Sequence, residues 1–152
     1  MSTTAKRAVL GDFMSVTCFQ YLRNGAEDIA GRVPIVAAGR QRGADLVASL
    51  ELQNSTQDVS AITAQLQAAL GAEGTRLCLL DSVTVKPSGG YEVRLHEGAC
   101  TAGAQAAEPV CAYTLGVFVG AISALTGRRL HGTETQCAAV AGEHCIYQID
   151  PL

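Results

Sequence analysis

The sequence predicts an α+β fold in a single domain over residues 1–152, with an antiparallel sheet from two hairpins packed against about four helices. Three observations predict it. Apolar residues repeat at helical spacing in the first half of the chain. The pattern then changes to strand-like alternation around glycine-containing turns, once in the middle of the chain and once at its end. A long apolar segment of helical length separates the two alternating regions, so the strands pair as hairpins.

The first two helices are expected at residues 15–31 and 34–52. Ser15 is a suitable cap for the first helix, which Asn24-Gly25 could interrupt. Gly39 and Gly43 lie four apart on one face of the second helix, where a neighbouring helix or a ligand could approach closely. We favour helix packing.

A third helix is expected at residues 58–71, between the cap Asp58 and the stop Gly71. The first hairpin follows, with strands over residues 75–85 and 91–98. A small-residue loop then leads to an uncharged helix over residues 109–127. Its length approaches a membrane span, but its small and polar residues favour a buried helix, with the span as the alternative. Residues 128–152 form the closing hairpin.

Composition narrows the function. The formal net charge is −3, and the only lysines are Lys6 and Lys86, so we expect no nucleic-acid binding. The N-terminus has no apolar secretory core. Six cysteines without such a signal favour reduced thiols or metal ligands over disulfides, and a cytoplasmic location.

The closing hairpin contains two cysteines, Cys137 and Cys145, that are symmetric about Ala141. A three-residue loop, Val140-Ala141-Gly142, with Gly142 in the left-handed conformation, would place the cysteines opposite each other. Opposed thiols could share a metal ion, form a disulfide, or be small buried apolar groups. The pattern alone leaves all three open.

A zinc site needs two further ligands. Glu134 lies an odd number of residues before Cys137, so joint ligation requires a bulge or bend around Thr135 and Gln136. Cys111, at the start of the apolar helix, could be the fourth ligand, because the positive helix end favours a thiolate. His131 and His144 are alternatives.

The closing segment resembles the signature of the 4-vinyl reductase (hydrocarbon-binding) domain family, in which a glutamate and two cysteines precede an apolar strand. Here these are Glu134, Cys137 and Cys145, followed by "IYQI". The glycine lies one position later than in the family pattern. The N-terminal stretch "AGRQRG" is also similar, so the resemblance covers most of the chain.

The resemblance implies a fold related to the small subunits of the TRAPP complex and a homodimer through the N-terminal helices. It also implies a structural zinc ion held by Cys111, Glu134, Cys137 and Cys145, with the chain bent at Glu134.

A binding function fits the residues better than catalysis. No nucleophile–base pair or dinucleotide fingerprint is evident, so we name no catalytic residue and expect no enzyme. The resemblance implies a pocket for an aromatic, hydrocarbon or tetrapyrrole ligand, in a sensor or carrier that could act through a partner protein. Candidate lining residues are Phe19, Tyr21, Tyr113, Val117, Phe118 and Tyr147. The alternatives are an enzyme or accessory factor of chlorophyll-type pigment synthesis, and an assembly module without a ligand.

Overall fold

The helices begin and end close to the predicted caps. In the computed structural model, which describes residues 7–152, the helices are α1 (Val16–Ala30), α2 (Arg32–Ser49), α3 (Val59–Leu70) and α4 (Ala112–Thr126). The Ser15 side chain accepts a hydrogen bond from the Cys18 N–H at 3.1 Å, as a cap should. Asp58 does the same for Ser60 at 3.1 Å. Asn24-Gly25 does not interrupt α1.

The two predicted hairpins form one sheet. Its strands are β1 (Leu79–Val85), β2 (Tyr91–His96), β3 (Leu130–Gln136) and β4 (Cys145–Pro151), in the order β1-β2-β4-β3. All three neighbouring pairs are antiparallel, so the predicted α+β class is confirmed. The first strand starts later than predicted, because the Leu77 and Cys78 N–H groups donate to the Leu70 carbonyl at the end of α3.

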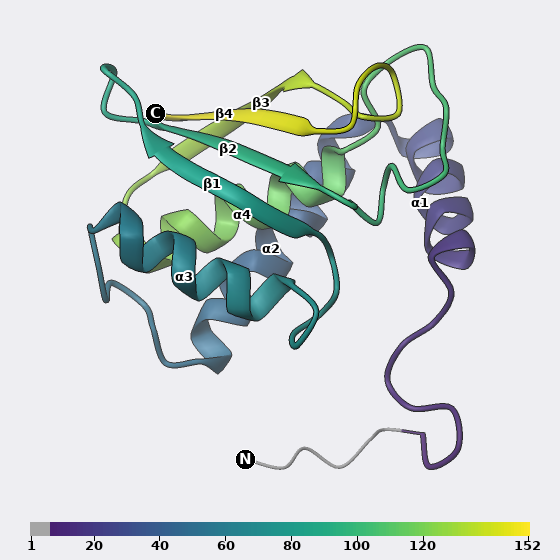
Figure 1. Cartoon of the computed structure of the whole chain (residues 1–152), viewed down its shortest axis with the longest axis horizontal. Helices are drawn as coiled ribbons and strands as arrows, with labels where there is room; N and C mark the ends of the chain where they lie inside the picture. The colour runs from purple at the N-terminus through teal and green to yellow at the C-terminus, as the bar shows by residue number, and fades with distance from the viewer. Residues whose placement is uncertain (1–6) are drawn as a thin grey trace.

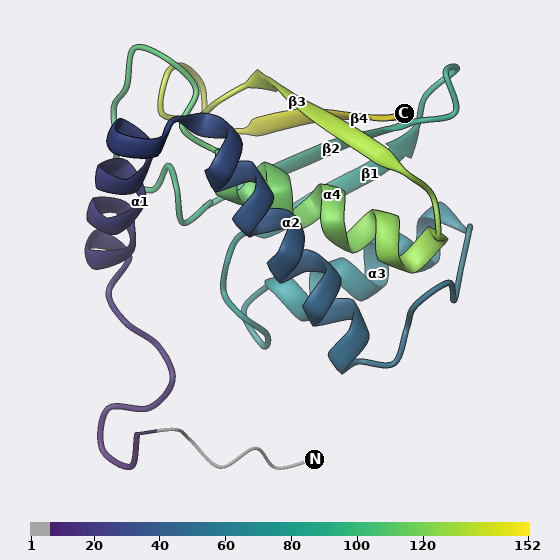
Figure 2. The same cartoon turned by 180° about the vertical axis from the view of Figure 1, so that it is seen from behind.

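The helices cover one face of the sheet (Figure 1). α4 and α3 lie directly against that face, and α2 lies on the far side of α4 (Figure 2). α1 stands at the end of the sheet, beside the β2–α4 and β3–β4 connections. Between sheet and helices, Phe118 and Tyr147 are fully buried and meet edge to face, with ring centroids 6.1 Å apart.

Glycines allow α2 and α4 to cross at backbone distance. A Cβ on Gly39 would lie 2.2 Å from the Tyr113 carbonyl oxygen, and one on Gly43 would lie 2.1 Å from that of Val117. The preference for helix packing at this face is therefore correct. Both glycines are buried inside the chain, so they offer no surface to a second copy.

Within residues 7–152, none of the helices combines the length and apolarity that crossing a membrane requires.

Candidate metal centre and ligand cavity

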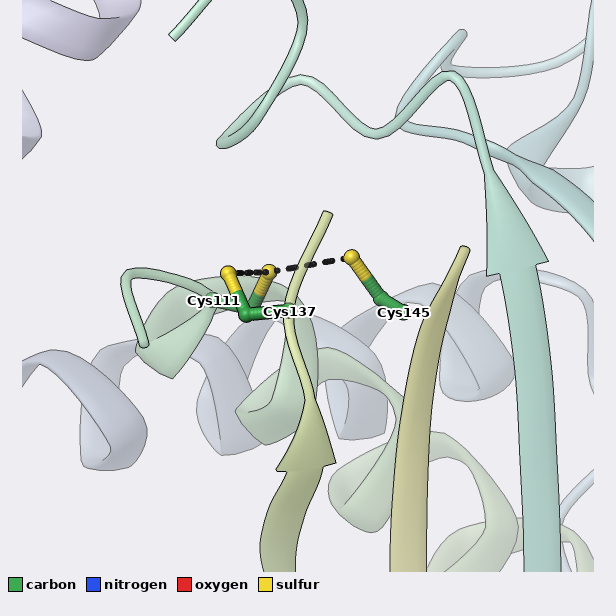
Figure 3. A group of neighbouring side chains, drawn as sticks. All are labelled: Cys111, Cys137 and Cys145. Carbon is green, nitrogen blue, oxygen red and sulfur yellow. Dashed lines mark hydrogen bonds between the residues drawn. The ribbon is translucent and has the colours of Figure 1, made fainter. Parts of the chain in front are cut away.

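Three buried thiols converge at one end of the sheet (Figure 3). The Sγ atom of Cys111 lies 3.8 Å from that of Cys137 and 3.5 Å from that of Cys145. All three sulfur atoms lie within 4.8 Å of one another. The structure therefore brings together three of the four predicted metal ligands as a single donor set.

Each thiol is placed by the end of a secondary-structure element. Cys111 is the N-terminal cap of α4, Cys137 directly follows β3, and Cys145 begins β4. The register shifts between Glu134, which pairs with Tyr147, and Gln136. This is the bulge at the position where the parity argument required one.

The connection between the two strands differs from the predicted three-residue loop, which is wrong. Pairing of β3 with β4 ends at Gln136, and residues 137–144 form the connection. The Val140 and Ala141 N–H groups both donate to the Cys137 carbonyl at 3.0 Å, which turns the chain away from the ladder. Gly142 has the expected positive φ, 74°.

The sulfur spacing suits a metal ion better than a disulfide. Tetrahedral Zn²⁺ with Zn–S bonds of about 2.3 Å sets its thiolates about 3.8 Å apart. A disulfide needs about 2.0 Å between sulfur atoms. The six cysteines, all within the described residues, are free thiols. The observed separations of 3.5 and 3.8 Å thus fit a shared cation without rearrangement.

The three thiols share their protons unequally. Hydrogen bonds from Cys111 and then Cys145 lower the pKa of Cys137, because they stabilise its thiolate. The pKa of Cys111 is raised, first by its hydrogen bond to Cys137, then by that to Cys145 and by burial. The Ala138 N–H also points at the Cys145 sulfur, 3.4 Å away. One sulfur is therefore already disposed to be a thiolate before a metal arrives.

Glu134 lies beside the thiols but outside the three-sulfur set. Its side chain is only 2% exposed, and Oε1 accepts from the Arg32 guanidinium at 2.5 Å. The Cys111 N–H also donates to Oε1 at 3.1 Å and, more weakly, to Oε2 at 3.3 Å. Burial raises the pKa of Glu134, an effect that Arg32 opposes and Cys137 reinforces. Oε2 therefore keeps most of its capacity to accept a further partner.

Arg32 was not among the predicted site residues. It also donates to the Pro109 carbonyl at 3.2 Å, so it joins the start of α2 to the start of α4. The sequence signal for it was weak: a single arginine at the start of a helix, far along the chain from its partner. The alternative ligands His131 and His144 lie outside the thiol set.

A separate cavity of about 400 Å³ opens between α1, α4 and the segment before β1. Phe19, Tyr113 and Val117 line it together, and the rings of Phe19 and Tyr113 meet edge to face at 5.6 Å. Phe118 and Tyr147 lie instead in the core, and Tyr21 is 77% exposed.

Several lining residues of the cavity were not foreseen. Phe13 and Met14 come from the segment before α1, and Arg42 and Arg76 bring two positive charges to the wall. The Arg76 guanidinium lies over the Phe13 ring at 5.1 Å. Phe13 and Met14, next to the Ser15 cap, were the available signal, since two large apolar side chains before a helix need a partner surface.

Comparison with known families identifies the second half of the chain. A family model for the vinyl-4-reductase (V-4-R) domain matches residues 91–151, which include all four predicted metal ligands. This part of the chain is a vinyl-4-reductase domain. The resemblance inferred from the closing cysteine signature is therefore confirmed. A comparison with curated proteins gives no match.

Solved structures extend the fold of the vinyl-4-reductase domain to nearly the whole chain. The phenol-responsive sensory domain of the transcription activator PoxR, with phenol, aligns with a TM-score of 0.66 at 18% identity, over 91% of this chain and 75% of its own. A vinyl-4-reductase family protein from Methanocaldococcus jannaschii gives 0.59 at 9% identity, over 94% and 85%.

More distant functions share the same fold. An H-NOX protein from S. oneidensis gives a TM-score of 0.63 at 11% identity, over 97% of this chain and 82% of its own. A trafficking protein particle complex subunit 3 from Naegleria fowleri, covalently bound to palmitic acid, gives 0.55 at 12% identity, over 93% and 84%. The predicted relation to TRAPP subunits is confirmed for the fold.

Proposed function

We propose that this chain is a small-molecule-binding sensor or carrier domain that takes an aromatic or hydrocarbon ligand and is stabilised by zinc. The observation that supports it most directly is the cavity of about 400 Å³ beside α4. Its volume lies toward the lower end of the range for small-molecule sites. This size favours a single aromatic ring system or a short hydrocarbon over a tetrapyrrole, and an open cavity argues against a filled assembly module.

The chemistry of the cavity wall supports an aromatic ligand with one polar group. Phe19 and Tyr113 offer ring faces and edges, and aromatic rings pack favourably in such edge-to-face arrangements. Burial raises the pKa of Tyr113, so its hydroxyl is neutral and can donate or accept a hydrogen bond. Arg42 and Arg76 would favour a ligand oxygen that carries negative charge.

The residues present fit a zinc ion. Cys111, Cys137 and Cys145 would hold it as thiolates, with Glu134 as the fourth ligand through Oε2 while Oε1 remains with Arg32. Arg32 would then orient a metal ligand, as outer partners of metal sites commonly do. Bound zinc would supply a structural cross-link, because four protein ligands leave no open position. Zinc binding would also require a reducing, cytoplasmic-type environment.

The metal centre and the cavity are adjacent through α4. Cys111 caps the helix, and Tyr113 lies in its first turn and lines the cavity. Fixing Cys111 between two other thiols fixes the position at which this turn begins. The proposed zinc therefore keeps the cavity in shape without contacting the ligand.

Two further features belong to this proposal. The outer side of α1 and the start of α2 expose large apolar residues, which would suit a homodimer contact through these helices: Tyr21, Leu22, Ile29 and Val33. A sensor would pass the signal to a partner protein, whereas a carrier would deliver the ligand.

The experiment is calorimetric titration of zinc-replete protein with phenol, indole and decanoate, paired with two variants from one loop. Ala99 lines the cavity, whereas the side chain of Ala102 is exposed. Ala99→Phe should fill the cavity and abolish binding, and Ala102→Phe should bind as the native chain does. Absence of binding by all three probes, or equal binding by both variants, would contradict the proposal. Turnover of chlorophyllide with an added reductant would favour the enzyme alternative.

A further inference from the structure

A second group of metal-binding side chains lies on the opposite face of the sheet from the thiols. Asp81, His96 and His144 each offer one donor atom, and the three atoms lie within 4.8 Å of one another. They come from β1, from the end of β2 and from the residue before β4, which are neighbours in the order β1-β2-β4. This group is separate from the thiol set and from the cavity.

The sheet register explains how the two histidines meet. Leu95 pairs with Cys145 in the antiparallel β2–β4 ladder, so His96 and His144 are the next residues along. Leu95 and Cys145 are fully buried toward the helices. Because side chains alternate along a strand, the neighbouring histidines point to the outer face. Their ring centroids are 5.6 Å apart.

A β-bulge brings the carboxylate to the same place. The β1–β2 register shifts between Leu80 and Ser82, so Asp81 is the extra residue of the bulge. Leu80 is buried, and Ser82 pairs with the outward-facing Arg94. Asp81 can therefore share the outer face with Ser82, which strict alternation would forbid. Bulges commonly redirect a side chain in this way.

The distances match those around a metal ion. Asp81 Oδ1 lies 2.9 Å from His96 Nδ1, and Asp81 Oδ2 lies 3.5 Å from His144 Nε2. A metal with bonds of about 2.0–2.2 Å to nitrogen and oxygen sets its donor atoms about 3.0–3.5 Å apart. The two separations cover this range.

The His96 ring nitrogen that faces Asp81 is poorly satisfied by the protein. Its Nδ1 is buried and makes no hydrogen bond, although the Asp81 oxygen is close. At 2.9 Å without hydrogen-bond alignment, the nitrogen and the carboxylate oxygen gain little from each other. A cation bound to both atoms would satisfy them together. The site is also partly open, since the three side chains are between 28% and 37% exposed.

We propose that Asp81, His96 and His144 form a second metal site, which takes a divalent transition-metal ion such as Zn²⁺, Co²⁺ or Ni²⁺. Two imidazoles and one carboxylate suit these borderline ions, whereas Ca²⁺ and Mg²⁺ prefer all-oxygen ligands. Three protein ligands leave positions for water, which distinguishes this site from the closed thiol centre. The bound ion would join β1, β2 and β4 at one point on the outer face.

Untagged protein, loaded with zinc at its thiols, is dialysed against Co²⁺ and its cobalt content and absorption spectrum are measured. We expect one equivalent of Co²⁺ per chain, with weak visible bands and no intense thiolate-to-cobalt absorption. His96→Ala and His144→Ala should lose this equivalent. The third histidine of the chain, His131, is the matched control, and His131→Ala should retain it.

Three outcomes would overturn the proposal: no cobalt uptake by the native chain, uptake that survives His144→Ala, or uptake that requires His131. Thermal unfolding of each variant shows whether it folds. If the variants do not fold, imidazole NMR of the native chain still decides, because Zn²⁺ must shift the ring signals of two histidines and leave the third unchanged. None of these readouts depends on whether the thiol centre holds zinc.

Discussion

Replacing Arg32 by methionine is the sharpest test of how Glu134 is held. Methionine keeps an apolar stem at the start of α2 but removes the guanidinium that donates to Glu134 at 2.5 Å. The Glu134 carboxylate, 2% exposed, would keep only the Cys111 N–H as a partner. Arg32→Met should therefore destabilise the protein and loosen the metal centre together.

The magnitude follows from the two exposures. A hydrogen bond to a charged group contributes about 1.5–3 kcal/mol. The Arg32 side chain is 36% exposed, so solvent already weakens the pair and we expect the lower part of this range. A loss of about 2 kcal/mol corresponds to an approximately 30-fold smaller folding constant. Loss of an outer partner of a metal ligand should also weaken zinc binding about 10–100-fold.

The pH dependence has a definite sign. Burial already raises the folded pKa of Glu134 above its ordinary value, so acidification favours the folded state through this group. Removing Arg32 removes a lowering effect and raises this pKa further. The penalty of Arg32→Met should therefore be greatest near pH 7 and shrink as the pH falls toward 4.5, the ordinary value.

The assay is urea unfolding in chelator, followed by zinc competition with a chromophoric chelator. Arg129→Met is the control, since Arg129 is an exposed arginine. If Arg32→Met matched Arg129→Met in both measurements, Glu134 would not depend on Arg32, and the proposed orientation of the fourth ligand would be wrong.

Three other predictions concern parts of the fold away from Glu134. Gly120→Ala should cost about 3 kcal/mol in urea unfolding, because the new Cβ would lie 2.1 Å from a carbonyl oxygen of α2. In native protein at pH 7.5, iodoacetamide should label the exposed Cys18 and spare Cys78, whose pKa burial raises to about 12, as mass spectrometry of the peptides would show. Lys86→Met should lose stability relative to the native chain at pH 7 but not at pH 2, because Lys86 lowers the pKa of Asp150 and that contribution disappears as the carboxylate is protonated; urea unfolding at both pH values measures it.

Each of these has an internal comparison. Gly25→Ala lies in α1 with open space around its Cβ, so it should stabilise the helix by about 0.5–1 kcal/mol. Equal effects at positions 25 and 120 would contradict the close crossing of α2 and α4. Rapid labelling of Cys78 would show that its strand opens readily. A Lys86→Met penalty that persists at pH 2 would point to packing and not to charge.

Local sequence signals predicted the local structure well. Ser15 and Asp58 are caps because their side-chain oxygens satisfy free N–H groups, which needs only nearby residues. The bulge between Glu134 and Gln136 followed from strand parity combined with the requirement that Glu134 and Cys137 cooperate. That requirement came from the family pattern.

Long-range pairings were beyond these signals. Arg32 and Glu134 lie on α2 and β3, and nothing in either local pattern indicates that they meet. The outer group of Asp81, His96 and His144 depends on β2 pairing with β4, a contact between two separate hairpins. The roles of Phe118 and Tyr147 depend on which side of α4 faces the sheet, and a helix that is apolar on every side does not reveal this.

Gly31 is the one residue between α1 and α2, and its φ of 82° and ψ of −180° form a combination that is essentially restricted to glycine. Everything that α1 contributes to the cavity, including Phe19, is therefore aimed by a single pair of dihedral angles. A side chain at position 31 would redirect the whole helix while leaving the sheet and the thiol cluster in place. Evolution or engineering could in this way change which ligands the domain admits without touching a residue that contacts them.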